Sequence, residues 1–205
     1  MKHATKMTLM SAALAAFALP VFAQSTSTPA PVTGASIQDR KENQQDRIAN
    51  GVKSGELNAN ETTTLEKKES SLNQEERDMR KLDNGKLTTA DKATLNQQQN
   101  QLSRQIYKDK HNAAAQNTHP TTEVGKRAEN QQDRIAQGVK SGQLTAREAA
   151  HLENKEAKIN REVKADRAVN GGKLTAQEKA QVNRQQNRES RQIYKDKHNN
   201  RKQAK

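Results

Sequence analysis

The sequence predicts an all-α protein made of two tandem three-helix repeats behind a flexible N-terminal leader. Three observations lead to this fold class. Residues 42–112 align without a gap onto residues 129–199 at a constant offset of 87, and 43 of the 71 paired positions are identical. A Gly-x-Leu-(Thr/Asn)-x-x-(Glu/Asp) phrase recurs four times. Apolar residues follow a helical period, and no stretch alternates with period two.

The first 23 residues have the pattern of a secretory signal peptide. A positive segment at Lys2, His3 and Lys6 precedes a short apolar run. Pro20 ends that run, and Ala23 offers a cleavage site. We therefore expect a signal peptide over residues 1–23, a flexible leader over residues 24–37, and a periplasmic or secreted bacterial protein. The chain has no cysteine, so a disulfide framework is excluded.

The four recurring phrases place the turns between helices. In each phrase, Gly supplies the left-handed conformation that ends a helix. Thr or Asn then caps the next helix, and the acid three residues later completes a capping box. These Gly-x-Leu-Thr-x-x-Glu turns predict helices over residues 38–53, 58–82, 88–111, 125–140, 145–169 and 175–198.

Apolar residues form a narrow stripe along the predicted helices, as in Leu65, Leu72 and Met79, which are seven residues apart. The second copy has Asp166 in place of Met79 and Glu189 in place of Leu102, so we expect those two positions at the periphery. The core positions that keep an apolar partner in both copies are Ile48, Val52, Leu57, Leu65, Leu72, Leu82, Leu87, Leu95, Ile106 and Tyr107.

The repeats should depend on additional contacts for their stability. About ten to twelve buried apolar side chains per repeat are few to offset the conformational entropy that is lost when the chain becomes ordered. We therefore expect the repeats to pack on each other, to form a homodimer, or to stay dynamic until a partner binds. The predicted segments are a helical repeat over residues 38–112, a linker over 113–128, a second helical repeat over 129–199 and a basic tail over 200–205.

The turns resemble the second half of a calcium-binding EF-hand in shape but not in ligands. Calcium needs oxygen ligands at the first, third and fifth loop positions, where this chain has residues such as Arg80, Val52 and Leu82. No serine lies in a nucleophile elbow, no histidine pair has zinc spacing, and no Gly-rich loop could cradle phosphate. We expect no enzyme activity and no cofactor.

An Ile-Tyr-Lys-Asp-Lys-His-Asn block occurs unchanged in both copies. A helix places each tyrosine one turn from the histidine of its block, so His111 and His198 are candidate metal ligands. The interpretation that we prefer is a helix end, where Lys and His favour the macrodipole and tyrosine seals the core.

A second unchanged block is wholly polar. Two interpretations are open: a recent duplication with little drift, or a contact surface that both copies share. The residues of the candidate contact surface are Gln45, Asp46, Arg47, Gln132, Asp133 and Arg134.

Positive charge is concentrated near the C-terminus. Residues 42–112 carry 12 basic and 12 acidic side chains, whereas residues 129–205 carry 18 basic and 10 acidic ones. Charge is therefore an addition to the repeat, and clustered cations predict salt-dependent binding of a polyanion such as DNA or lipopolysaccharide. Too few aromatic residues are present for sequence-specific recognition. The candidate polyanion-binding residues are Arg184, Arg188, Arg191, Arg201 and Lys202.

The Leu-Thr-x-x-(Glu/Asp) turns at residues 87–91, 144–148 and 174–178 resemble the paired Leu-Thr-x-x-Gln motifs of Spy-like periplasmic stress chaperones, with an acid where that family has Gln. Those small, basic, all-helical exported proteins bind unfolded clients without ATP. The chain is also similar to exported helical repeat proteins of proteobacteria. The resemblance implies a non-enzymatic, stress-protective role as a chaperone or scaffold, with a protein client or envelope component as partner. The alternative is the polyanion binder.

Overall fold

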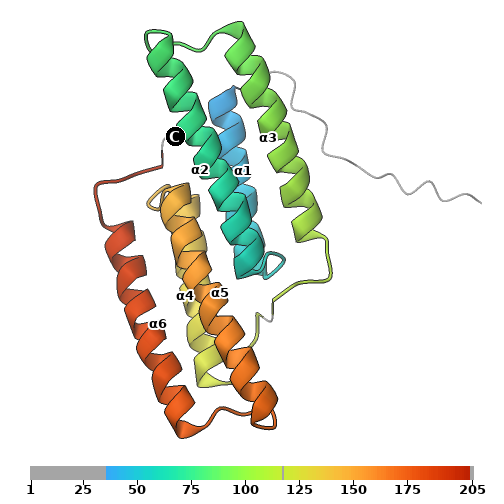
Figure 1. The fold of residues 1–205 in the computed structure, drawn as a ribbon, viewed down its shortest axis with the longest axis vertical. Helices are drawn as coiled ribbons and strands as arrows, with labels where there is room; N and C mark the ends of the chain where they lie inside the picture. Colours follow the sequence, from blue (N-terminus) through green and yellow to red (C-terminus); the bar gives the residue numbers. More distant parts are fainter. Residues whose placement is uncertain (1–35, 117, 204–205) are drawn as a thin grey trace, which may run out of the picture. The chain divides into compact units, whose positions relative to one another are not determined.

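The computed structural model describes residues 36–116 and 118–203 and confirms an all-α fold (Figure 1). The helices are α1 (Ile37–Ser54), α2 (Ala59–Leu82), α3 (Thr89–Lys110), α4 (Glu123–Lys140), α5 (Ala146–Val169) and α6 (Ala176–Lys197). Residues 36–116 and 118–203 contain no strand. Helices of 18, 24 and 22 residues follow one another twice. The predicted helix boundaries lie within about two residues of these.

The four Gly-x-Leu-(Thr/Asn)-x-x-(Glu/Asp) phrases form turns between helices, as the sequence predicts. The four N-caps are Asn58, Thr88, Thr145 and Thr175, and each makes a reciprocal capping box with the acid three residues later. The backbone of Gly55 has φ 73° and that of Gly142 has φ 69°. Both values lie in the left-handed region of backbone conformation, which glycine adopts with the least steric strain. This change of conformation ends α1 and α4.

A glycine inside α1 and another inside α4 let the leucine of the following turn pack against the helix. A Cβ at Gly51 would lie 2.7 Å from the Leu57 side chain, and a Cβ at Gly138 would lie 2.6 Å from that of Leu144. Both leucines are fully buried. Each first turn is therefore held tightly against the helix that precedes it.

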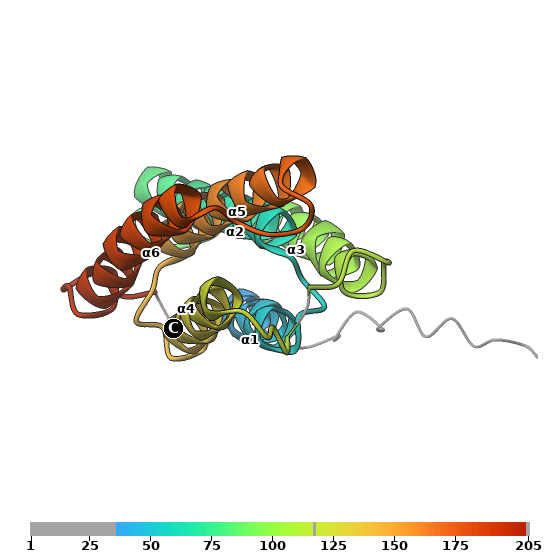
Figure 2. The ribbon, with the colours of Figure 1, turned by 90° about the horizontal axis from the view of Figure 1, so that it is seen from below.

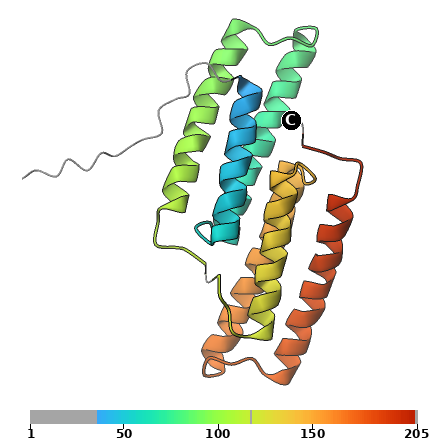
Figure 3. The same ribbon diagram turned by 180° about the vertical axis from the view of Figure 1, so that it is seen from behind.

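Equivalent helices of the two copies pack against each other. α2 contacts α5 over the most extensive helix interface of the described residues, and α1 contacts α4 (Figure 2). The partners run antiparallel in both pairs (Figure 3). α3 packs on α1 and α2, and α6 packs in the same way on α4 and α5. Each repeat thus buries one of its faces against the other repeat.

Most of the predicted core positions are buried. One apolar cluster contains Ile48, Val52, Leu57, Leu65, Leu72, Leu95, Leu102 and Ile106. Two further clusters belong mainly to the second copy and include Ile135, Leu144, Leu152 and Ile193 in one and Val124, Ile159, Val163 and Val182 in the other. Leu87 and Met79 are partly buried against the first cluster.

Three expectations about burial are wrong. Leu82 is 84% exposed because it is the last residue of α2, where the chain turns away towards α3. Tyr107 is 36% exposed and stacks on His111 instead of sealing the core. Leu102 is only 2% exposed, because it lies one helical turn from Ile106 on the buried face of α3.

The segment boundaries also differ from the prediction. Ile37, assigned to the leader, begins α1 behind a capping box made by Ser36 and Asp39. α4 begins at Glu123, inside the predicted linker. The chain after each third helix returns to the first turn of its copy, where the Gln116 N–H donates to the Gly55 carbonyl at 2.7 Å. The Gln203 N–H donates to the Gly142 carbonyl at 3.1 Å, so part of the predicted tail is held in place.

The predicted signal peptide, and the leader up to residue 35, lie outside the described residues. Within the helices that are described, none has a stretch long and apolar enough to span a membrane.

Candidate functional site

The outer face of α6 carries a continuous row of cations. Arg184, Arg188, Arg191 and Lys195 follow one another at spacings of four, three and four residues, which places them on one side of a helix. All four are exposed. No ion pair or hydrogen bond engages any of these four side chains in the described part of the chain. We call these four residues the α6 basic row.

The local structure explains why the row faces outwards. Thr175 and Glu178 start α6 with a capping box. The opposite side of the helix is buried against α4 and α5 through Val182, Gln186, Glu189 and Ile193. Because these buried side chains hold that side inwards, the arginines on the other side are exposed to solvent.

The equivalent row of α3 is less basic. The residues 87 positions earlier are Gln97, Gln101, Arg104 and Lys108, and all four are exposed. The two helices have the same length and pack in the same way on their own repeats. They therefore form an internal pair that differs on this face mainly by two positive charges.

Two of the predicted polyanion-binding residues lie apart from this row. Arg201 and Lys202 are exposed and follow the end of α6. The Arg201 N–H donates to the Asn199 side chain at 2.7 Å, within the segment that returns to Gly142. The structure therefore groups Arg184, Arg188 and Arg191 on one face, adds Lys195 to them, and leaves the other two cations beyond the helix.

The prediction of a contact surface in the shared polar block is wrong for the two glutamines of that block. Gln45 and Gln132 are buried, and their side-chain amides donate to Glu66 at 3.2 Å and to Glu153 at 2.9 Å. Their amide groups are therefore engaged inside the protein and do not form an exposed contact surface. Of the six residues, only Asp46 and Asp133 are exposed.

The arginines of this block also bond within their own repeat. Arg47 donates to the Ser103 carbonyl at 3.0 Å, and Arg134 donates to the Ser190 carbonyl at 3.0 Å. Both arginines are half-buried. These bonds join the first helix of each copy to its third helix, which gives a structural reason for the identity of the block.

A second pair of glutamines also joins the first helix of each copy to its third helix, with one hydrogen bond donated from each side. Gln44 donates to the Gln99 carbonyl at 2.6 Å, and the Gln99 side chain donates to the Ile37 carbonyl at 2.8 Å. The second copy repeats both bonds with Gln131, Gln186 and Val124. The signal that could have revealed this was the spacing of Gln44, which lies one turn from Ile48 on the buried stripe.

The interior also holds four glutamates, which we call the interface glutamates: Glu66 and Glu69 on α2, and Glu153 and Glu156 on α5. Each is 0% exposed. Desolvation by burial raises the pKa of Glu69 to about 7 and that of Glu153 to about 8. Sequence reasoning missed these residues because charged residues are usually placed on the surface. Their three-residue spacing beside Leu65 and Leu72 was the available signal.

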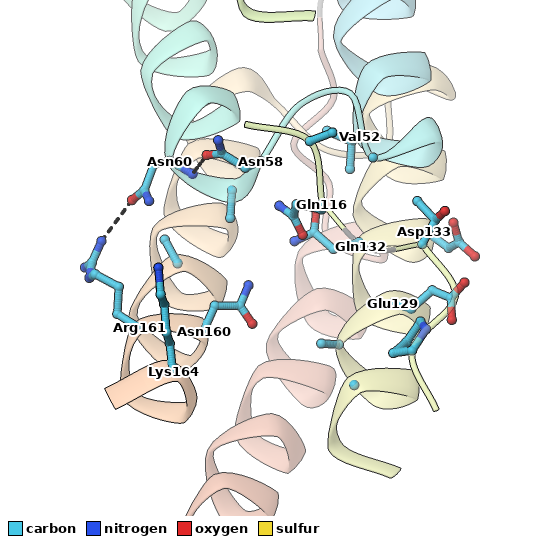
Figure 4. A pocket seen from close by; sticks show the side chains of 18 of the residues that line it. Val52, Asn58, Asn60, Gln116, Glu129, Gln132, Asp133, Asn160, Arg161 and Lys164 are labelled. Atoms are coloured by element: carbon cyan, nitrogen blue, oxygen red, sulfur yellow. Dashed lines mark hydrogen bonds between the residues drawn. The ribbon is translucent and has the colours of Figure 1, made fainter. Parts of the chain in front are cut away.

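A cleft of about 620 Å³ lies where the start of α2, the linker, α4 and α5 meet (Figure 4). Arg161 and Lys164 line it from α5, and Glu129 and Asp133 line it from α4. The Arg161 guanidinium already donates to the Asn60 side-chain oxygen at 2.9 Å. Because both signs of charge line this cleft, its electrostatics select no single class of ligand.

The candidate metal ligands sit at the ends of α3 and α6. The rings of His111 and His198 stack on Tyr107 and Tyr194, each with a centroid separation of 4.1 Å. The Nδ1 atom of each histidine lies 2.7 Å from the carbonyl oxygen of its tyrosine. Residues 36–116 and 118–203 bring together no group of three or more His, Cys, Asp or Glu side chains suited to a metal ion.

Comparison with protein families, with curated proteins and with solved structures found no match. The function must therefore be inferred from the charge, exposure and bonding of the residues described above. Among these, the α6 basic row is the surface feature that distinguishes one copy most clearly from the other.

Proposed function

We propose that this protein is a non-enzymatic binding protein of the bacterial periplasm or exterior, and that it binds the phosphate backbone of nucleic acid through the α6 basic row. One observation carries the proposal: four cations lie exposed on one helix face, and no carboxylate of residues 36–116 or 118–203 forms an ion pair with them. The export part rests on the signal-like residues 1–23.

The row suits a linear array of phosphates. The residues from Arg184 to Lys195 span about 16 Å of helix at 1.5 Å per residue. One strand of duplex DNA presents a phosphate about every 3.4 Å along its axis, so the row can face several phosphates at once. Such contacts neutralise charge without reading bases, which fits a chain whose aromatic side chains outside the signal-like segment are Tyr107 and Tyr194.

The surroundings of the row favour nucleic acid over lipopolysaccharide. A helix that binds a lipid surface places large apolar residues beside its cations, so that they enter the acyl region. On α6 the large apolar residues Val182 and Ile193 are buried in the protein, and Tyr194 alone is exposed among the large apolar side chains. The row therefore offers charge but little apolar surface.

The same exposure data favour a polyanion over an unfolded protein client. A client-binding chaperone needs an apolar surface to compete with the client's own collapse. In the described residues the exposed large apolar side chains are Leu82, Tyr107, Val169 and Tyr194, which lie at the ends of four different helices. We therefore propose the nucleic-acid ligand in preference to the chaperone-like and scaffold roles.

The test is a titration of the full chain into a fluorescently labelled DNA duplex at several salt concentrations. With four phosphate contacts, the slope of log K against log salt should be about −3 to −4. The double variant Arg184→Gln/Arg188→Gln makes α6 resemble α3 and should reduce the size of that slope by about 2. The control Lys67→Gln/Lys68→Gln removes the same charge from exposed positions of α2.

Two results would refute the proposal. One is an absence of DNA binding at low salt, and the other is an equal loss of affinity in the α2 control. Vesicles that contain lipopolysaccharide form a separate arm of the titration. Tighter binding to those vesicles than to DNA, with the same dependence on Arg184 and Arg188, would assign the row to a lipid phosphate instead.

A further inference from the structure

The interface glutamates lie on the two helices that join the repeats. Glu66 and Glu69 belong to α2, Glu153 and Glu156 belong to α5, and these helices form the most extensive contact between the copies. Glu66 and Glu153 also repel each other electrostatically across the interface. A change in the charge of these groups therefore acts directly on the contact between repeats.

The hydrogen bonds of these glutamates do not compensate a negative charge. Glu66 and Glu153 each accept one bond, from Gln45 and Gln132, and the second oxygen of each has no partner. Neither oxygen of Glu69 has a hydrogen-bond partner, and the same is true of Glu156. An ionised carboxylate buried in this way is costly, whereas a protonated one is far less so.

The charged groups that face this cluster from the neighbouring helices do not balance it. Lys41 of α1 faces Glu69, but Glu76 of α2 faces the same residue and accepts the bond from Lys41 at 2.9 Å. Glu189 of α6 faces both α5 glutamates and pairs with Lys155 at 3.7 Å. α4 contributes the neutral Gln132. Carboxylates thus outnumber cations in this interior.

The two copies keep this arrangement although an apolar alternative is compatible with the fold. Glu76 of α2 becomes Val163 in α5, and both side chains are buried. A buried acid of this helix can therefore be exchanged for an apolar residue. At the positions of the interface glutamates, by contrast, both copies have glutamate: Glu66 corresponds to Glu153, and Glu69 corresponds to Glu156.

We propose that the contact between α2 and α5 is a proton-dependent closure, which holds while the interface glutamates are protonated and loosens when they ionise. This inference is independent of nucleic-acid binding, since the α6 basic row is not part of the interface. Its consequence is a protein whose two repeats are joined most firmly in acid and separate more easily in alkaline medium.

The direction follows from the titration of the four groups. Burial raises the pKa of Glu69 to about 7 and that of Glu153 to about 8, and it raises the pKa values of Glu66 and Glu156 well above their ordinary value of 4.5. Below pH 4.5 these groups are protonated in both the folded and the unfolded chain, so their contribution to stability is fully present. That contribution is lost as the pH rises towards 7 and 8.

The test is thermal unfolding of the full chain, followed by helical circular dichroism from pH about 5 to pH about 9. We expect the Tm of the natural sequence to fall across this range. Glu66→Gln/Glu153→Gln places neutral side chains of the same shape in the interface, so its Tm should fall much less. The control Asp46→Asn/Asp133→Asn removes two exposed carboxylates from α1 and α4 and should follow the natural sequence.

A flat or rising Tm in the natural sequence would overturn the proposal, as would an unchanged fall in the glutamine variant. A second measurement does not depend on whether that variant folds. Carbon-13 NMR of the side-chain carboxyls in the natural sequence should show glutamates that titrate near neutral pH. The protection factors of the α2 and α5 amides, corrected for the intrinsic rise of exchange with pH, should decrease over the same range. Titration of every glutamate near its ordinary pKa would contradict the proposal.

Discussion

The first repeat buries an ion pair where the second has two apolar side chains, one of them buried and the other half-buried. Lys41 and Glu76 lie 2.9 Å apart between α1 and α2, and the residues 87 positions later are Ala128 and Val163. Burial acts to raise the pKa of Glu76, but hydrogen bonds from Lys41 and Arg80 outweigh it and lower that pKa. The packing of the first helix on the second therefore tolerates the loss of both charges together, because neither copy contains one charge of this pair without the other.

The opposite exchange occurs between the third helices. Leu102 is buried in the apolar cluster of the first repeat, and its counterpart Glu189 is equally buried but lies beside Lys155. Burial raises the pKa of Glu189 to about 7, and Lys155 works in the other direction. Compared with the first repeat, the second thus lacks the buried acid at the position of Glu76 on its second helix and has an additional one, Glu189, on its third helix.

The surfaces of the two copies differ in another way. The residues that both copies share, such as Gln44, Gln45 and Arg47, make bonds inside the repeat. The two arginines that the second copy adds, Arg184 and Arg188, face solvent. The shared polar residues of the first helix thus bond inside the repeat, whereas Arg184 and Arg188 add positive charge to an exposed face on which both copies already carry an arginine and a lysine.

The largest effect is expected from breaking the buried pair on one side only. Lys41→Ala removes the cation from beside two buried acids and should reduce the free energy of unfolding by about 3 kcal/mol at neutral pH. Lys41→Ala/Glu76→Val reproduces the side chains of the second copy and should restore stability to within about 1 kcal/mol of the natural sequence. Urea denaturation measures both variants. A double variant as unstable as the single one would show that the copies are not interchangeable at this pair.

A smaller effect is expected from giving the second repeat the leucine of the first. Glu189→Leu should raise the free energy of unfolding by about 2 kcal/mol at pH about 8. The gain should be smaller in acid, because the pKa of Glu189 is raised to about 7 and the stability lost by its ionisation is lost as the pH rises through that value. Urea denaturation at both pH values checks this, and an equal gain in acid would contradict it.

The smallest effect is expected from the helix caps, where the copies use different residues for the same bond. Asn58 caps α2, and Thr145 caps α5. Asn58→Ala and Thr145→Ala should each cost about 1 kcal/mol, since each removes one acceptor from the first helical turn. Thermal unfolding of the two variants tests this equality. A loss confined to one copy would indicate that its second helix does not depend on the capping box.

The turns and helix ends could be predicted from the sequence because their determinants are local. The Gly-x-Leu-(Thr/Asn)-x-x-(Glu/Asp) phrase carries both the left-handed glycine and the capping box, so no tertiary contact is needed to place it. Leu82 shows where local reasoning fails. It continues the apolar stripe of α2 but lies beyond the point where another helix covers that face.

The polar interior could not be predicted in the same way. Leu65 and Leu72 identify the buried face of α2, but Glu66 and Glu69 are buried as well, and the apolar pattern does not include them. Their burial depends on contacts with helices that are distant in the sequence, such as the bond from Gln45 of α1 to Glu66. The same holds for Gln44, whose partner is a backbone carbonyl 55 residues away. The α6 basic row was predicted in part, because Arg184, Arg188 and Arg191 share a helical spacing.

The most direct test of the nucleic-acid proposal moves the charge without changing its amount. The variant Arg184→Gln/Arg188→Gln/Gln97→Arg/Gln101→Arg exchanges two side chains between equivalent faces of α6 and α3. NMR of the natural sequence with a DNA duplex should show shifts on α6, and in the variant the shifts should move to α3 at similar affinity. Shifts that stay on α6, or that spread equally over both helices in the natural sequence, would contradict binding by the α6 basic row.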